Sequence, residues 1–253
     1  MKIILLGLSF LLCFIDKGFA WSIDSVNKES KQTRVNLVFC SLHYTDKQDL
    51  SRDINIILER LKKTRPFDEN MEALRIWRIN LTSAEEKGIF KEKEGFPPLG
   101  VRQDFLDNIS TKLKSNYKLI IIDARGSVSC AELSSKDKLS LVIIGRARYS
   151  NAQSFAKGFL HELGHSLGLR DECIDCGELC PPGEPNCAET QEEAKAWWGD
   201  MVGKVERVNY IHGCCGNKNY IRPVIASLMN DTEKAEDFGP VNERFLSEEL
   251  RRD

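Results

Sequence analysis

The chain has 253 residues, 42% of them hydrophobic, and a formal net charge of −2 at pH 7. A near-neutral charge gives no electrostatic basis for binding nucleic acid or an anionic membrane, so we expect neither as a partner. The length and the apolar content fit one sizeable domain with its own core.

The amino terminus has the features of a secretory signal peptide. Lys2 precedes an apolar run from Ile3 to Ile15, and Gly18-Phe19-Ala20 offers the small residues that a signal peptidase reads. We therefore expect residues 1–20 to be removed and the protein to be secreted, to the extracellular space or the periplasm. The run is short for a membrane span, so no membrane contact is expected after cleavage; an uncleaved anchor is the alternative. Residues 21–33 are expected to form a flexible arm or a short activation segment.

Hydrophobic periodicity predicts alternating strands and helices up to residue 145. Runs of β-branched and aromatic residues indicate strands, and apolar residues at helical spacing indicate helices. The expected strands are Arg34–Cys40, Leu74–Asn80, Tyr117–Asp123 and Leu139–Gly145, with one helix between Asp46 and Pro66, another over Arg102–Ser115, and a polar loop ending at Gly95-Phe96-Pro97-Pro98. This alternation predicts an α/β fold with a mixed, mostly parallel sheet and helices on its faces. The last strand is either the edge of an active-site cleft, to which an extended peptide could add, or an ordinary interior strand.

The segment Phe159–Cys173, F-L-H-E-L-G-H-S-L-G-L-R-D-E-C, predicts a metal site. On a helix that starts near Asn151, His161 and His165 lie one turn apart on the same face, so both imidazoles can reach one Zn²⁺. Zn²⁺ with three protein ligands keeps one position for water and lowers the pKa of that water to about 7. Glu162 lies beside the histidines and is free to accept the proton, so the motif predicts a zinc hydrolase with Glu162 as its catalytic base.

Two histidines leave the metal one ligand short. Gly168 can end the helix in a left-handed turn, which lets the chain return so that Asp171 becomes the third ligand. A carboxylate is an acceptable zinc ligand. Glu172 and His212 are the alternatives for the third position.

Cysteines are abundant in the second half of the chain. Eight remain once Cys13 leaves with the signal peptide: Cys40, Cys130, Cys173, Cys176, Cys180, Cys187, Cys214 and Cys215. An even count in an exported chain favours disulfides, above all between residues 173 and 215, where few apolar residues are available to build a core. The alternative for this segment is a second, structural zinc bound by Cys173, Cys176 and the Cys214-Cys215 pair.

Several motifs together resemble the immunoglobulin-A metallopeptidase family of secreted zinc peptidases. They are H-E-L-G-H-S-L-G-L-R-D-E, the later S-L-M-N around Met229, and F-G-P-V-N-E-R-F-L after it. R-P-F-D-E-N and L-R-I-W-R-I-N extend the resemblance over most of the mature chain. Between the zinc motif and Met229, a further helix is expected over Glu189–Lys204.

The resemblance implies a zincin-like fold, a single catalytic domain over residues 34–253. Zinc would lie between an upper part with the sheet, about 34–168, and a disulfide-rich, loop-dominated lower part, about 169–253. Met229 would then belong to the Met-turn under the metal, the feature that names the metzincins. The chain departs from the family pattern at Cys173, where an aromatic is usual, and at Ser41-Leu42-His43-Tyr44-Thr45, where the family has a glycine-rich turn.

The first functional hypothesis is a secreted zinc-dependent endopeptidase, a monomer that acts on a protein or peptide. His161, His165 and Asp171 would hold one zinc ion, and Glu162 would act as general base and then as general acid. The second hypothesis is a disulfide-stabilised, non-catalytic binding protein on a zincin scaffold, favoured by the unusual third ligand and the altered first turn. A third, a zinc hydrolase of a non-peptide amide, shares the chemistry of the first.

Overall fold

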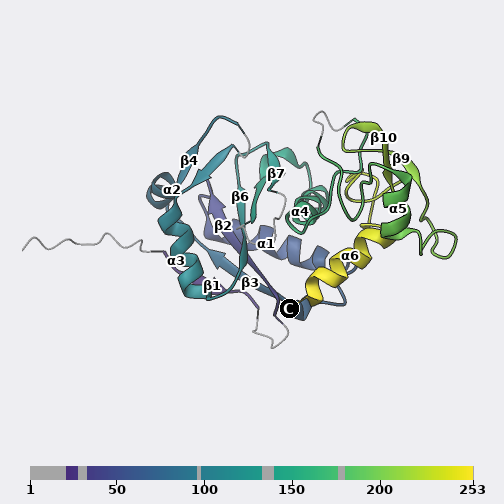
Figure 1. Cartoon of the computed structure of the whole chain (residues 1–253). Helices are drawn as coiled ribbons and strands as arrows, with labels where there is room; N and C mark the ends of the chain where they lie inside the picture. Colours follow the sequence, from purple (N-terminus) through teal and green to yellow (C-terminus); the bar gives the residue numbers. More distant parts are fainter. Residues whose placement is uncertain (1–20, 28–32, 96–97, 133–139, 176–179, 253) are drawn as a thin grey trace, which may run out of the picture.

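The computed structural model describes residues 21–27, 33–95, 98–132, 140–175 and 180–252, which form a larger part with a sheet and a smaller part rich in loops (Figure 1). The expected signal peptide, residues 1–20, lies outside the described residues. Among the helices that are described, none combines the length and the apolar character needed to cross a membrane.

A six-stranded mixed sheet forms the centre of the larger part, with the order β1-β3-β2-β6-β8-β7. Its strands are β1 (Ile23–Ser25), β2 (Val35–Leu42), β3 (Leu74–Ile79), β6 (Tyr117–Asp123), β7 (Ser129–Ala131) and β8 (Ser140–Gly145). The inner strands are parallel, and the short outer strands β1 and β7 run antiparallel to their neighbours. The predicted mixed, mostly parallel sheet is confirmed.

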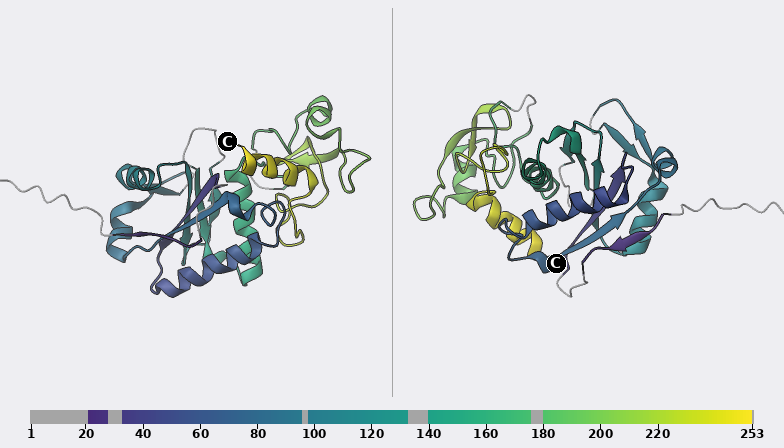
Figure 2. Two further views of the ribbon diagram at one scale, coloured as in Figure 1. Left: turned by 90° about the horizontal axis from the view of Figure 1, so that it is seen from below. Right: turned by 180° about the vertical axis from the view of Figure 1, so that it is seen from behind.

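Helices cover both faces of the sheet (Figure 2), because strands in the middle of a parallel sheet are apolar on both sides. Alternate residues of β2 point to opposite faces. Phe39 joins the core formed with α1 (Lys47–Leu61) and α4 (Ala152–Ser166). Val38 joins the core formed with α3 (Gln103–Leu113). The helix predicted after Asp46 is α1, and the Asp46 side chain accepts a hydrogen bond from the N–H of Gln48.

The smaller part is built from short elements around Trp198. These are α5 (Gln191–Trp198), the hairpin of β9 (Ile211–Cys214) and β10 (Asn217–Arg222), and α6 (Pro240–Arg251). In α6, Val241 belongs to the core of the smaller part, whereas Leu246 and Leu250 belong to the core under α1 and α4. This helix, yellow in Figure 1, therefore joins the two parts.

Disulfides cross-link the smaller part, as the cysteine pattern predicted. Cys180 is bonded to Cys215 and Cys187 to Cys214, and Cys173 is also disulfide-bonded. Cys176 lies outside the described residues. Because Cys214 and Cys215 are both oxidised, they offer no thiolates to a second, structural zinc.

Cys40 and Cys130 are buried free thiols, so the expectation that an even count implies pairing is wrong for these two. Cys40 lies on β2 and Cys130 on β7, and β6 and β8 separate these strands. A strand spacing of about 4.8 Å puts them roughly 14 Å apart, twice the Cα separation that a disulfide tolerates. Burial raises the pKa of the Cys130 thiol to about 12 and that of Cys40 well above its usual range.

The segment expected as a polar loop forms α2 (Ser83–Ile89) and β4 (Phe90–Glu92), and β4 pairs with β5 (Leu99–Val101). Phe96 and Pro97, near the end of the expected loop, lie outside the described residues. Thr82 and Glu85 form a capping box at the start of α2, a local signal that the sequence carried. A single turn of 3-10 helix, Met71–Ala73, precedes β3.

The strand preceding the metal-site helix is an interior strand. β8 lies between β6 and β7, so the interior alternative holds and β7 is the sheet edge on this side. β7 lies beside α4, and its Ser129 hydroxyl accepts a hydrogen bond of 2.9 Å from the Tyr149 hydroxyl. A strand of three residues is too short to give the alternating pattern on which the prediction depended.

The first residues of the expected flexible arm belong to the fold. β1 pairs antiparallel with β3, and Trp21 is only 5% exposed, with its ring edge-on to Phe105. An indole buried in this way anchors the segment, so the structure differs from the expectation over 21–27. Residues 28–32 of the expected arm lie outside the described residues.

Candidate metal centre

The helix with the H-E-x-x-H motif, α4, is fixed at both ends. At its start, the side chain of Asn151 accepts a hydrogen bond of 2.9 Å from the N–H of Ser154. At its end, Gly168 has φ +110°, a conformation that glycine adopts without strain. The helix buries Phe155 and Phe159 in the core against the sheet, which leaves the motif on the side toward the smaller part.

The structure brings together the three side chains that were expected to hold a metal. Nε2 of His161 and Nε2 of His165 are 3.1 Å apart, and Oδ1 of Asp171 lies 3.4 Å from each. Ligands at about 2.0–2.2 Å from a tetrahedral zinc stand roughly 3.3–3.6 Å apart, so the spacing fits one Zn²⁺. Within the described residues, this is the one group of three or more His, Cys, Asp or Glu side chains close enough to share an ion.

Hydrogen bonds hold both imidazoles with Nε2 toward the centre of this cluster. Nδ1 of His161 donates to the carbonyl oxygen of Leu228 at 2.8 Å, and Nδ1 of His165 donates to that of Leu169 at 2.9 Å. A proton on Nδ1 leaves the lone pair on Nε2, which is what a metal ligand requires. Sequence reasoning did not identify these carbonyl partners.

The turn after Gly168 brings Asp171 to the histidines. The N–H of Leu169 donates to the carbonyl of Gly164 at 3.0 Å, which closes the end of the helix. The carbonyl of Asp171 accepts a hydrogen bond of 2.9 Å from the N–H of Cys215, which is disulfide-bonded to Cys180. The cross-linked part of the chain therefore holds the backbone of the third side chain of the cluster.

Neither alternative to Asp171 joins the cluster. His212 is exposed on β9. Glu172 is fully buried, and its carboxylate accepts hydrogen bonds from Asn186 at 2.9 Å, from Asn242 at 2.8 Å and from the Ser227 hydroxyl at 2.5 Å. The oxygens of Glu172 are thus hydrogen-bonded to these three side chains and not to the imidazoles. Glu172 therefore links separate segments of the chain, a structural role that the sequence did not reveal.

Met229 lies in a turn that packs against α4. The turn is closed by the N–H of Asn230, which donates to the carbonyl of Ser227 at 3.0 Å. Met229 is fully buried against α4, and a Cβ added to Gly164 would lie 2.7 Å from its sulfur. The turn is also tied to the metal-site residues, because Met229 accepts a hydrogen bond of 2.8 Å from the N–H of Glu172.

Glu162 is a buried carboxyl, 7% exposed, beside this cluster. Burial raises its pKa to about 7, and the charge of Asp171 adds to the rise. The positive charge of His165 opposes the rise, and so does that of Arg148, which ends the single turn of 3-10 helix Arg146–Arg148 before α4. A carboxyl with a pKa near 7 can both accept and return a proton at neutral pH.

The other ionisable groups of the cluster are shifted by burial and by one another. The pKa of His161 is lowered to about 4, first by burial and second by the charge of the neighbouring His165. For His165, burial is outweighed by the hydrogen bond and charge of Asp171, so its pKa is raised. The same pairing outweighs burial at Asp171 and holds the pKa of its carboxyl below the usual range. At neutral pH His161 is therefore uncharged and Asp171 ionised, the forms in which these side chains bind metals. His165, whose pKa is raised, binds a metal only in its neutral form, so a metal there competes with a proton.

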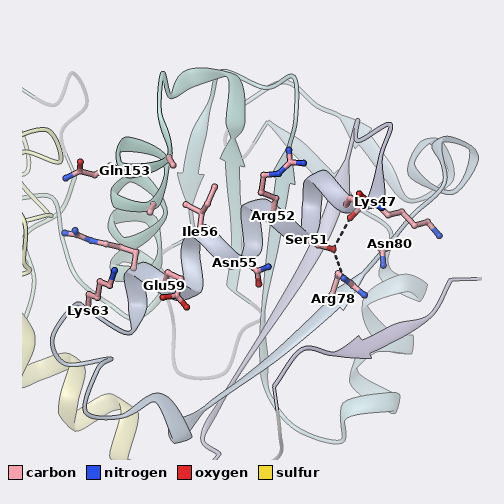
Figure 3. A pocket seen from close by; sticks show the side chains of 14 residues that line it. Lys47, Ser51, Arg52, Asn55, Ile56, Glu59, Lys63, Arg78, Asn80 and Gln153 are labelled. Atoms are coloured by element: carbon pink, nitrogen blue, oxygen red, sulfur yellow. Dashed lines mark hydrogen bonds between the residues drawn. The ribbon is translucent and has the colours of Figure 1, made fainter.

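A groove elsewhere on the molecule differs in character. It lies along one face of α1, has a volume of about 800 Å³ and is rich in basic side chains, among them Lys47, Arg52 and Arg78 (Figure 3). Ser51 joins two of them, accepting from Arg78 at 2.7 Å and donating to the carbonyl of Lys47 at 3.0 Å. No histidine, cysteine or aspartate is among the described residues that line it, so it offers no comparable catalytic or metal-binding set.

Comparisons with known proteins do not identify a family. No protein-family model matches the chain, and no curated protein matches its sequence. Among solved structures, archaemetzincin from Methanopyrus kandleri is similar over 88% of this chain and 98% of that chain, with a TM-score of 0.41 and 13% sequence identity. Similarity at this level identifies neither a family nor an activity. The resemblance to immunoglobulin-A metallopeptidases therefore stays a prediction.

Proposed function

We propose that the chain is a zinc-dependent peptidase with Glu162 as its general base. The observation that carries the proposal is the convergence of His161 Nε2, His165 Nε2 and Asp171 Oδ1 within 3.4 Å of one another, beside a buried carboxyl. Two nitrogens and one carboxylate oxygen are a ligand set of catalytic zinc sites. His161, His165 and Asp171 would hold the ion.

Bound zinc would supply a Lewis acid that lowers the pKa of a water molecule and polarises the scissile carbonyl. The chain's own residues manage the protons. A carboxylate oxygen of Glu162 accepts a proton from water and then returns it to the leaving nitrogen, which a pKa near 7 favours in both directions. The carbonyls of Leu228 and Leu169 keep the imidazoles oriented throughout.

A peptide substrate would lie along β7. This strand is the sheet edge beside α4, and an edge strand can take an extended peptide through main-chain hydrogen bonds. The hydrogen bond from Tyr149 to Ser129 fixes the strand relative to the helix that carries Glu162. This arrangement favours peptides over small non-peptide amides.

We further propose that the protein acts as a monomer outside the cell or in the periplasm. Disulfides such as Cys180–Cys215 and Cys187–Cys214 persist in oxidising compartments. This support is independent of the amino-terminal signal motif.

The test is a Glu162→Gln variant, compared with the parent for zinc content and for hydrolysis of casein. We expect the variant to keep its zinc and to lose at least about two orders of magnitude in rate, the scale of one general base. Glu192→Gln, at an exposed position of α5, is the matched control and should behave as the parent. Equal activity in parent and Glu162→Gln would remove Glu162 from the mechanism.

The rival hypothesis, a binding protein without turnover, makes a different prediction in the same experiment. It predicts zinc in all three proteins and no hydrolysis by any of them. The buried Glu162 argues against it, because a purely structural zinc site does not need an unpaired carboxyl whose burial raises its pKa. Hydrolysis of small amides but not of casein would favour the non-peptide hydrolase.

A further inference from the structure

A second crevice lies where the sheet changes direction. Along the chain, β2 is followed by β3 on one side of it, whereas β6 is followed by β8 on the other side. The carboxyl ends of β2 and β6 thus form a topological switch point, the place where open α/β sheets bind ligands. A crevice of about 860 Å³ opens there, lined by the loops that follow β2 and β6 and by the α2–β4–β5 segment. Its volume is in the range of small-molecule sites.

His43 is held in this crevice by unusual backbone geometry. It follows β2 in the segment Ser41–Thr45 and has φ +60°, in the left-handed region that side chains other than glycine seldom adopt. Its N–H lies 3.1 Å from both carboxylate oxygens of Glu86, a side chain that is 5% exposed. Such strain persists only where the surroundings enforce it, and it concentrates at functional sites.

The imidazole of His43 is also oriented. Its Nδ1 lies 2.8 Å from Oδ1 of Asp123, the last residue of β6, and this oxygen also accepts from the N–H of Arg125 at 3.0 Å. The loop packs closely over the other oxygen, since a Cβ at Gly126 would lie 2.6 Å from it. Nε2 of His43 has no hydrogen-bond partner among the residues that the structure describes, and the side chain is 42% exposed.

The charges that remain available in the crevice are mainly positive. The carboxylates of Glu86 and Asp123 are both engaged with His43, and of the lining carboxylates only that of Glu92 has no partner within the described part of the chain. In contrast, no hydrogen bond or ion pair joins the side chains of Lys87, Lys93 or Arg125 to another residue within the described part of the chain, and all three line the crevice.

The floor of the crevice is apolar. Phe90, Leu99 and Ile143 line it, and beside them Val128 is 50% exposed. A ligand that combined an apolar body with an anionic group would cover this floor and meet the free cations.

We propose that this crevice binds a small organic anion, a carboxylate or a phosphate on an apolar body. The anion meets the side chains of Arg125 and Lys87, and the apolar body rests on Phe90 and Val128. Nε2 of His43 donates to the anion when the imidazole also carries its second proton, since Nδ1 already donates to Asp123. The site is distinct from the metal centre, because none of His161, His165 and Asp171 lines it. It would take either a carboxylate or a phosphate ester, since both present oxygens to donors of this kind.

The test is a titration of metal-free protein with phenyl phosphate, followed through the imidazole carbon–proton NMR signals. The chain has 4 histidines, so the signals are few, and His43 is assigned from its absence in His43→Asn. Asparagine tolerates the left-handed backbone, so this variant should fold. We expect the His43 signal alone to move and to saturate with a midpoint below about 1 mM. Benzoate in a second titration would distinguish a carboxylate from a phosphate preference.

Two comparisons make the result decisive. The double variant Arg125→Gln, Lys87→Gln should bind at least tenfold more weakly, whereas the control Lys195→Gln, Lys218→Gln, with the same change of charge at exposed positions, should bind as the parent does. Inorganic phosphate should bind at least tenfold more weakly than phenyl phosphate, because it leaves the apolar floor uncovered. No saturation by about 10 mM, equal weakening in both double variants, or movement of the His161 and His165 signals instead would overturn the proposal. Because the metal is absent, none of these outcomes depends on peptidase activity.

Discussion

Two neighbouring carboxylates, Asp171 and Glu172, have opposite tasks because their surroundings differ. Asp171 points to two imidazole nitrogens with its pKa held low, so it is free to bind a cation. Glu172 is enclosed by Asn186, Asn242 and Ser227, which use its oxygens as acceptors. Metal affinity and fold stability should therefore depend on different members of the pair.

This division predicts two contrasting variants. Asp171→Asn should unfold near the parent temperature but should lose more metal affinity than the about 10–100-fold that outer-shell changes cost. Glu172→Gln should keep its zinc at room temperature but should lose about 2–4 kcal/mol of stability, since buried donors lose a charged acceptor. Chelator competition and thermal unfolding measure the two quantities. Zinc loss in Glu172→Gln at unchanged stability would contradict the assignment.

Glu243, half-buried near the start of α6, predicts a pH effect on stability. Burial and then the charge of Asp237 raise its pKa from the usual 4.5 to about 7. The folded protein therefore binds more protons than the unfolded chain between these values, so stability falls as pH rises through this window. Above about pH 7 the loss is constant, about 1–2 kcal/mol after allowance for solvent screening.

Glu243→Gln should remove this loss of folding stability at high pH. The variant should be more stable than the parent at pH 8 and equal to it near pH 4, where the carboxyl is protonated in both states. Glu248→Gln, exposed on the same helix, serves as the control and should change little at either pH. Urea unfolding at the two pH values measures the difference; an equal gain at both would mean that ionisation is not its cause.

At the residue scale, the positions that could be predicted are those with local geometry. His161 and His165 are one helical turn apart, so their convergence follows from spacing, whereas the turn after Gly168 left Asp171, Glu172 and His212 open as the third member. The hydrogen bonds around Glu172 could not be predicted, because Asn186 and Asn242 come from other parts of the chain. Short polar side chains carry no pattern that indicates such partners.

At the level of elements, the fit of α4 against the turn around Met229 depends on Gly164. In Gly164→Ala, the new Cβ would meet the Met229 sulfur at 2.7 Å and Phe238 at 3.1 Å. Overpacking of this kind costs about 1–3 kcal/mol, which should exceed the gain of about 1 kcal/mol in helix propensity. Gly88→Ala is the matched control, since nothing lies within 4 Å of its Cβ, and it should be neutral or stabilising. If Gly164→Ala unfolds at the same urea concentration as Gly88→Ala, the turn does not pack as described.

The longer elements of the larger part followed from periodicity, because β2, β6 and β8 are continuous apolar runs and α1, α3 and α4 have apolar stripes. The short strands β7 and β9 could not be found in this way. The helix expected over Glu189–Lys204 ends earlier, at Trp198, where the indole N–H donates to the carbonyl of Asn209 and the chain turns to the hairpin. Tertiary contacts, rather than local preference, set these boundaries.

For the whole molecule, the disulfides should stabilise the smaller part alone. Alkylation of the unfolded but unreduced protein should modify Cys40 and Cys130 and leave Cys180, Cys187, Cys214 and Cys215 unmodified. A reductant should first loosen the chain around the two disulfides, because the buried cluster there consists of the cysteines themselves, and zinc should be lost since Cys215 supports Asp171. Mass spectrometry of the labelled peptides checks the pairing. Zinc that remained bound after complete reduction would show that this support is dispensable.

The most direct test of the central claim is an anomalous difference map, collected above the zinc absorption edge from crystals of the purified protein. We expect one strong peak at about 2.0–2.2 Å from His161 Nε2, His165 Nε2 and Asp171 Oδ1, with Glu162 beside it and no peak among the cysteines. A map without a peak at these three atoms, or with zinc held by Glu172, His212 or cysteine sulfur instead, would contradict it.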